Sequence, residues 1–140
     1  YFEFPRSEVI ASSTYIDLRT LGFSENKISA IFSISELESQ GKLDNLLRTP
    51  ITHIFSELSK IKGIGNWTIQ YALIRGLGRY DIPLQNDKAL QRGMDSLFGE
   101  KYFTSQEDRS SFLEQYNMYI GYASFYLIYA NVISRNQDSS

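Results

Sequence analysis

The sequence has 140 residues, with 14 Lys and Arg against 16 Asp and Glu, one His and no Cys. This length fits one compact domain, and the lack of cysteine excludes disulfide bonds, a thiolate nucleophile and a Cys-based zinc site. The formal net charge of −2 argues against a polybasic binder of nucleic acid or membranes. No apolar run reaches the roughly 18 residues that span a bilayer, so we expect no membrane partner.

Helical patterns follow one another along the chain. The expected helices are, in order, one that enters at residues 5–8 and ends at Gly22, one from Ser24 to Gly41, a short one near 43–47, and then 51–58, 66–77, 86–99, 105–115 and 117–134. Residues 136–140 are expected to form a polar tail. Because no stretch alternates as a strand does, we predict an all-α fold, a helical bundle in one domain over residues 1–140.

The most informative stretch is the turn between the helices over 51–58 and 66–77. It follows an apolar-x-Gly-apolar-Gly pattern, with Gly63 and Gly65 at its two glycine positions. The outward-pointing amides of these glycines, at a helix N-terminus, are suited to bind a phosphate group, and the Thr68 hydroxyl adds a donor. This pattern predicts a helix-hairpin-helix motif over about 51–77 that binds DNA. A tight turn with glycines for packing, which needs no ligand, explains the turn equally well.

Several segments together resemble the helix-hairpin-helix DNA glycosylase superfamily, and within it the alkylated-base branch, the 3-methyladenine DNA glycosylase II type. These segments are residues 21–27, 62–68, 81–83, 86–87 and 121–127. The resemblance implies an HhH-GPD-like helical bundle and an enzyme of base-excision repair. Such an enzyme hydrolyses the N-glycosidic bond of alkylated purines such as 3-methyladenine. Its partner would be double-stranded DNA that contains a damaged base.

Asp87 stands at the position where that family carries an Asp that is essential for catalysis. Cleavage of an N-glycosidic bond builds positive charge on the sugar, which a fixed carboxylate stabilises. The same carboxylate can orient or deprotonate the attacking water. Helix N-capping is the commonest role of Asp at a helix start, and the two roles are compatible. We therefore predict Asp87 as the catalytic residue.

Trp67 stands where the bifunctional glycosylase/lyases of the superfamily carry a lysine that attacks the sugar. The resemblance therefore implies a monofunctional enzyme that uses water and leaves an abasic site. Trp67 is also a candidate to stack on the extruded base, where cation–π attraction favours a charged alkylated ring. Packing beneath the hairpin is an equally good interpretation of this tryptophan.

Five tyrosines recur every three or four residues near the end of the chain and so share one helical face. They are Tyr116, Tyr119, Tyr122, Tyr126 and Tyr129. An aromatic stripe at this spacing usually packs into the core, and this is the favoured expectation. The alternative is a wall of the base pocket, for which Tyr122 and Tyr126 are the best candidates.

Two departures from the family stand out. Residues 118–120 replace a Pro-Tyr/Trp-Arg-type stretch, and Ile128 stands where a tryptophan is expected. The helices and the Gln-rich wedge that precede the family's hairpin region do not appear in this sequence. We therefore expect the chain to be the C-terminal part of a longer glycosylase, or a shortened form.

No organic cofactor and no metal site built from side chains are expected. The resemblance implies a monovalent cation at the hairpin backbone near Ile61 and Gly63. We expect a monomer, located in the cytoplasm with the nucleoid in a prokaryote and in the nucleus in a eukaryote. The alternatives are a non-catalytic helix-hairpin-helix module that binds DNA, and an all-α interaction domain whose hairpin is only a turn.

Overall fold

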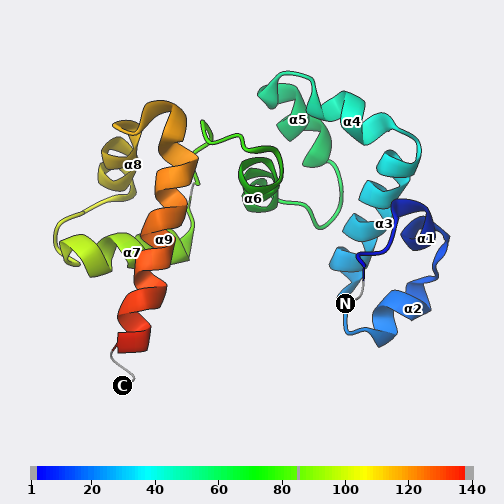
Figure 1. The fold of residues 1–140 in the computed structure, drawn as a ribbon, viewed down its shortest axis with the longest axis horizontal. Helices are drawn as coiled ribbons and strands as arrows, with labels where there is room; N and C mark the ends of the chain where they lie inside the picture. The colour runs from blue at the N-terminus through cyan, green and yellow to red at the C-terminus, as the bar shows by residue number, and fades with distance from the viewer. Residues whose placement is uncertain (1–2, 85, 138–140) are drawn as a thin grey trace. The chain divides into compact units, whose positions relative to one another are not determined.

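The computed structural model describes residues 3–84 and 86–137, and every regular element in these ranges is helical (Figure 1). The predicted all-α class is confirmed. The chain divides into two compact units whose boundary lies between Asn66 and Trp67. A single domain over residues 1–140 stays a prediction. Within the described ranges, no helix is both long and apolar enough to cross a membrane.

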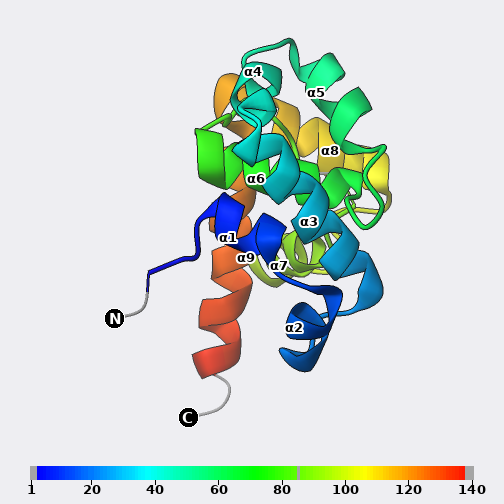
Figure 2. The same ribbon diagram turned by 90° about the vertical axis from the view of Figure 1, so that its right-hand side faces the viewer.

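The first unit is built around its longest helix, α3. Its helices are α1 (Ser7–Ser12), α2 (Tyr15–Thr20), α3 (Glu25–Ser39), α4 (Lys42–Leu47) and α5 (Ile51–Leu58). Helix α3 packs against α1, α2 and α4, and α4 packs against α5 (Figure 2). The apolar residues Ile28, Ile54 and Leu58 are buried. The amphipathic pattern over 51–58 is thus confirmed as a helix with a buried face.

The start of the chain differs from the expected single helix that ends at Gly22. Two short helices occupy this stretch, because Thr14 begins a new helix after the extended residue Ser13. The Thr14 hydroxyl accepts a hydrogen bond from the Asp17 amide at 3.2 Å, and the Asp17 carboxylate accepts one from the Thr14 amide at 2.7 Å. This reciprocal capping box satisfies amides that the first turn of a helix leaves free, so it favours a new start at this point.

The second unit begins within α6 and ends with the longest helix of the chain. Its elements are α6 (Asn66–Leu77, which starts at the boundary), α7 (Lys88–Phe98), α8 (Gln106–Glu114), the 3₁₀ helix η1 (Asn117–Tyr119) and α9 (Ile120–Gln137). Helix α9 packs against α7, α8 and η1. A Cβ atom added at Gly93 of α7 would lie 2.6 Å from the Leu127 carbonyl carbon of α9 and would overlap its oxygen. The two helices therefore meet backbone to backbone.

The last helix begins later and ends later than the predicted range 117–134. Asn117 has a left-handed φ of 47°, which an α-helix cannot include, so residues 117–119 form η1 and α9 starts at Ile120. Helix α9 continues to Gln137, and the prediction of a polar tail from residue 136 is wrong at 136 and 137. A helix that is already nucleated extends over polar residues at little cost. Residues 138–140 of the predicted tail lie outside the described residues.

The tyrosine stripe does not form part of the core. All five of its rings are exposed, with Tyr126 and Tyr129 each 61% exposed. Among the described side chains of α9, the buried residues are Ile120, Gly121, Ser124 and Leu127, which lie on another face of the helix. The favoured expectation of a packing role is therefore wrong, because α9 turns this other face towards α7.

Candidate functional site

Asp87 caps the helix that follows the loop over 78–87, as the sequence predicts. Its Oδ1 atom accepts hydrogen bonds from the backbone amides of Ala89 at 2.7 Å and Leu90 at 2.9 Å. The residue before it, Asn86, has a left-handed φ of 56°, a conformation that asparagine tolerates better than most residues. The carboxylate is only 6% exposed.

The second oxygen of this carboxylate contacts the hairpin helix α6. Asp87 Oδ2 accepts a hydrogen bond from the indole Nε1–H of Trp67 at 2.5 Å. One turn further along α6, the Tyr71 ring lies 4.2 Å from the Trp67 ring, centroid to centroid, with the planes tilted by 35°. We call these three residues the Asp87 cluster.

Charge in the Asp87 cluster comes from the carboxylate alone. Among the side chains that the structure describes (residues 3–84, 86–130, 132 and 133), no Lys or Arg forms an ion pair with Asp87. Burial raises the pKa of the Tyr71 hydroxyl, and the negative charge of Asp87 raises it further. A carboxylate that three N–H donors hold, with no cationic partner among the described side chains, is suited to stabilise a positive charge that develops on a ligand.

Tyr71 is a member of the site that the sequence analysis missed. Its signal was available, because residues four apart on a helix lie on the same face and Trp67 was already a candidate. Tyr71 also makes an edge-to-face contact with Phe125 of α9, with the centroids 5.0 Å apart. The Asp87 cluster is thus connected to α9 through Phe125.

The loop that carries Asp87 is held by the first turn of α9. The Gly121 amide donates a hydrogen bond to the Tyr80 carbonyl at 2.7 Å. A Cβ atom added at Gly121 would lie 2.6 Å from the Ile82 carbonyl oxygen. The backbone of the loop therefore lies directly against α9 a few residues before Asp87.

The two glycines of the hairpin turn have different surroundings. Gly63 has a φ of +92°, and a Cβ atom there would lie 2.9 Å from the Asn26 carbonyl carbon and closer still to its oxygen. Gly65 has a φ outside the left-handed range, and no described atom lies within 4 Å of its would-be Cβ. The Ile64 amide closes the turn on the Ile61 carbonyl at 3.0 Å. The fold of the turn thus requires glycine at 63 and leaves open space at 65.

The side chains that flank the turn are polar and exposed. Thr68 is exposed on the first turn of α6. Lys60 forms an ion pair with Glu57, and Lys62 forms one with Glu25, at N–O distances of 2.5 Å and 3.1 Å. Both lysines are thus partly neutralised within the chain, so the backbone amides of the turn are the better candidates to contact a phosphate.

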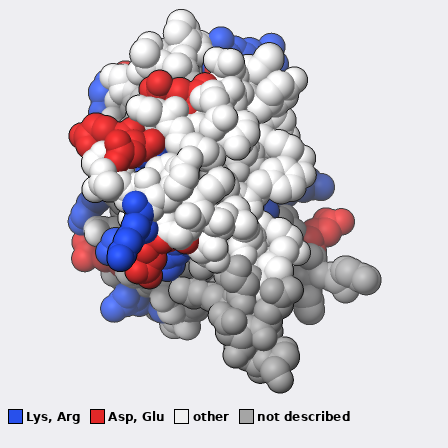
Figure 3. All heavy atoms as spheres, turned by 90° about the vertical axis from the view of Figure 1, so that its left-hand side faces the viewer, with Lys and Arg blue, Asp and Glu red and all other residues white. Residues whose placement is uncertain are grey.

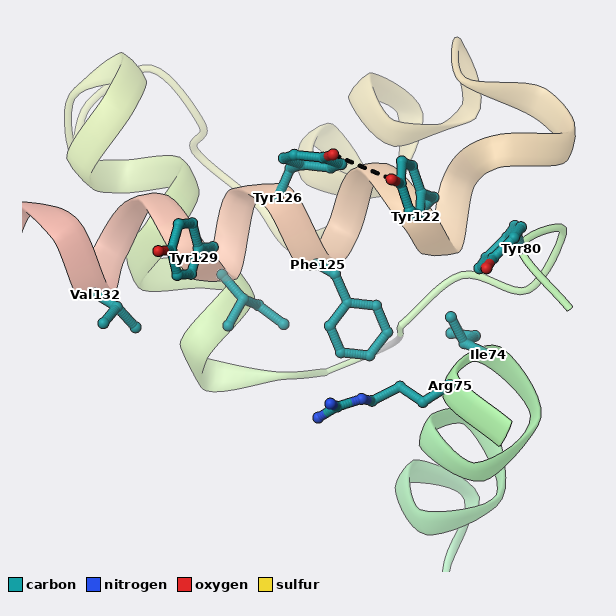
Figure 4. A pocket seen from close by; sticks show the side chains of 9 residues that line it. Ile74, Arg75, Tyr80, Tyr122, Phe125, Tyr126, Tyr129 and Val132 are labelled. Atoms are coloured by element: carbon teal, nitrogen blue, oxygen red, sulfur yellow. Dashed lines mark hydrogen bonds between the residues drawn. The ribbon is translucent and has the colours of Figure 1, made fainter. Parts of the chain in front are cut away.

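The two predicted pocket tyrosines line a separate pocket. The hydroxyl oxygens of Tyr122 and Tyr126 lie 3.1 Å apart, and the Tyr80 ring meets the Tyr122 ring edge to face (Figure 4). The pocket has a volume of about 480 Å³, and its lining includes Arg75 of α6 and Phe125. Asp87 and Trp67 are not among the lining residues, so the structure does not bring them together with this tyrosine pair.

The charged residues do not form a single-sign patch on the face shown in Figure 3. Acidic and basic side chains occur around the margin of this face, and its middle is made of uncharged residues. Among the described residues, no group of three or more His, Cys, Asp or Glu is placed to hold a metal ion. The chemistry of the candidate site therefore depends on the Asp87 carboxylate and its aromatic neighbours.

Comparison with known proteins relates this chain to one class of enzyme, although no protein-family model matches it. It is 32% identical over 126 residues to YfjP of Bacillus subtilis, provisionally named a DNA-3-methyladenine glycosylase, and the match covers 89% of this chain and 44% of that protein. Schizosaccharomyces pombe 3-methyladenine DNA glycosylase Mag1, solved in complex with abasic DNA, gives a TM-score of 0.76 at 27% identity, over 90% of this chain and 63% of that one.

A DNA-3-methyladenine glycosidase of Bacillus halodurans gives a TM-score of 0.73 at 28% identity, over 91% of this chain and 60% of that one. The chain spans less than two thirds of the length of each of these proteins. Its fold is that of the helix-hairpin-helix, HhH-GPD-type glycosylases, and the proteins it resembles in sequence and in structure are 3-methyladenine DNA glycosylases.

Proposed function

We propose that this chain carries the active centre of a monofunctional DNA glycosylase of the 3-methyladenine DNA glycosylase II branch. The enzyme hydrolyses the bond between deoxyribose and an alkylated purine such as 3-methyladenine. One observation carries the proposal: the buried carboxylate of Asp87 lies against the aromatic side chain of Trp67, in a chain with this glycosylase fold. The hairpin position holds this tryptophan in place of a lysine, so no amine is present there to form a Schiff base.

The proposed reaction uses Asp87 to stabilise charge. As the bond from the sugar carbon to the base nitrogen breaks, the bond electrons leave with the base and positive charge grows on the sugar. A cationic alkylated base departs as a neutral molecule, so it needs no strong acid. Water then adds to the sugar carbon and loses a proton, which leaves an abasic site. The Asp87 carboxylate stabilises the sugar cation and orients the water.

The aromatic members of the Asp87 cluster are proposed to contact the extruded base. Trp67 is 50% exposed although its indole N–H is bonded inside the protein, so one part of the ring is free to stack. Tyr71 extends this aromatic surface along α6. Stacking and cation–π attraction favour a charged alkylated ring. A role for Tyr122 and Tyr126 as a wall of the base pocket stays a prediction. It has less support, because these tyrosines line a pocket that does not include Asp87 or Trp67.

The proposed partner is double-stranded DNA with a damaged base, bound by a monomer. Amides at the turn of Gly63 and Gly65, with the Thr68 hydroxyl, would bind a backbone phosphate. A monovalent cation held by backbone carbonyls near Ile61 would add attraction for that phosphate. Because backbone amides carry no net charge, we expect DNA affinity with a shallow salt dependence.

The experiment is release of a damaged base from a duplex that contains 3-methyladenine or 1,N6-ethenoadenine. We expect abasic product from the wild type and a loss of about 100- to 1,000-fold in Asp87→Asn. Asparagine is as good an N-cap as aspartate, but its NH2 group cannot accept the Trp67 N–H, so the melting temperature is measured beside the activity, and a loss in a variant that stays folded at the assay temperature would be chemical. Asp81→Asn, at an exposed carboxylate paired with Arg79, is the matched control and should keep full activity.

Two outcomes would contradict the proposal. Activity that survives Asp87→Asn would show that the carboxylate is only a cap. DNA binding without any base release, and with no response to Asp87→Asn, would favour the non-catalytic DNA-binding module instead.

A further inference from the structure

We propose that Trp67 is a positioning residue, whose indole N–H locks the Asp87 carboxylate into one orientation. The kinetic consequence rests on the function proposed above, whereas the hydrogen bond itself does not. This role differs from base stacking, because it uses the N–H edge of the indole, while stacking uses its face.

The first step of the argument is the geometry of the carboxylate. Two backbone amides at the start of α7 hold Oδ1 and so restrain rotation about the Cβ–Cγ bond, but they do not contact Oδ2. The Trp67 Nε1–H, 2.5 Å from Oδ2, holds the second oxygen and so adds a further restraint on this rotation. The Tyr71 hydroxyl also interacts with this carboxylate, so donors from α6 and from the start of α7 surround the group. The carboxylate therefore has a fixed orientation.

The second step is that Trp67 is itself held in place. Its ring is stacked on Tyr71, the Tyr71 ring meets the edge of Phe125, and the Arg75 guanidinium lies 5.8 Å from the centroid of Phe125. All of these residues belong to the second unit, as does Asp87. A donor whose ring packs on Tyr71, which is itself held by Phe125 of α9, can impose an orientation on its acceptor.

The third step is the contrast in exposure. Asp87 is 6% exposed, whereas Trp67 is 50% exposed. The indole therefore covers the carboxylate with its N–H edge and still presents ring surface outside. A ligand that stacks on Trp67 would then lie next to the Asp87 carboxylate, which Trp67 has already aligned. Trp67 would therefore serve both base binding and the positioning of the carboxylate.

The hydrogen bond can be tested without any catalytic assay. Trp67 is the single tryptophan of the sequence, so the chain gives one indole N–H signal in a ¹H–¹⁵N spectrum, which Trp67→Phe would remove and so assign. We expect this signal downfield of a free indole and slow to exchange with solvent, because a charged acceptor polarises the N–H. Asp87→Asn should move the indole signal upfield. Asp81→Asn removes an exposed carboxylate of the same unit and should leave the indole signal in place. A signal with the shift and exchange of a free indole, indifferent to Asp87→Asn, would overturn the proposal.

Kinetics then separate positioning from base binding. Under single-turnover conditions, Trp67→Phe keeps an aromatic ring but loses the N–H, so we expect the maximal rate to fall about 10- to 100-fold with half-saturation changed less than about threefold. Trp67→His, which regains a ring N–H, should recover part of the rate lost in Trp67→Phe. A rise in half-saturation with an unchanged rate would overturn the positioning role. A wild type that releases no base would refute the proposed function, and the spectrum would still decide whether the bond exists.

Discussion

The turn of the hairpin offers a matched pair of substitutions, Gly63→Ala and Gly65→Ala, which separate folding from DNA contact. At Gly63 the alanine would have a left-handed φ, at a cost of about 1–2 kcal/mol. Its Cβ atom would also overlap the Asn26 carbonyl, and overpacking of this kind costs about 1–3 kcal/mol. We therefore expect the free energy of unfolding to fall by roughly 2–5 kcal/mol, which lowers the melting temperature on the order of 10 °C.

At Gly65 neither cost applies, because its φ is not left-handed and the space around it is open. Alanine there should change the free energy of unfolding by less than about 1 kcal/mol, in the stabilising direction, because it restricts the unfolded chain. If a phosphate approaches these amides, the added methyl should still weaken binding to duplex DNA about tenfold, since close approach of a ligand to backbone needs glycine.

The assays are urea unfolding followed by circular dichroism and fluorescence anisotropy with a labelled duplex at low salt. Two results would refute the reasoning. Equal destabilisation by Gly63→Ala and Gly65→Ala would mean that both glycines serve packing. A folded Gly65→Ala variant with wild-type DNA affinity would mean that no phosphate approaches the turn at this residue.

The remaining predictions concern helix packing and the tyrosine pair. Gly93→Ala should lower the free energy of unfolding by about 2–4 kcal/mol, because the new Cβ overlaps the Leu127 carbonyl. Gly76→Ala, in open space on α6, should instead raise the free energy of unfolding by about 0.5–1 kcal/mol. Similar melting temperatures for the two variants would contradict the close contact between Gly93 and Leu127. The hydrogen bond with Tyr126 raises the pKa of Tyr122 above its ordinary value of 10.0, so Tyr126→Phe should lower it. A ¹³Cζ titration by NMR measures this, and an unchanged pKa would show that the hydroxyls do not interact in solution.

Sequence reasoning predicted the elements that local signals specify. The helices over 51–58 and 66–77 have the predicted bounds, since Pro50 and the glycine turn delimit them and an apolar face repeats every three or four residues. The break at Thr14 is also encoded locally, as a threonine with an aspartate three residues later, but no clear hydrophobic periodicity accompanies it and it was not predicted. Local signals thus suffice where a proline or glycine boundary coincides with a clear apolar face.

The site was predictable in part for a similar reason. Asp87 lies at a helix start, which the sequence shows, and its cap follows from that position. The bond from Trp67 to Asp87 joins residues twenty apart, and no local rule predicts such a pair. The exposure of Tyr122 and Tyr126 depends on which face of α9 meets α7, and backbone contact at a glycine decides this. Periodicity identifies a face but does not identify its partner.

The contact between Gly121 and the loop before Asp87 predicts where inactivating mutations should occur along the gene. Position 121 has no room for a side chain, because the Ile82 carbonyl and the Ile74 side chain occupy the space. A larger residue there would push on the loop that delivers the carboxylate, although 34 positions separate Gly121 from Asp87 along the chain. If the proposed glycosylase function is correct, a genetic screen for repair-deficient alleles should recover changes at codon 121 beside those at codon 87. A map of such alleles along the gene would show two separate hotspots that correspond to one place in the folded protein.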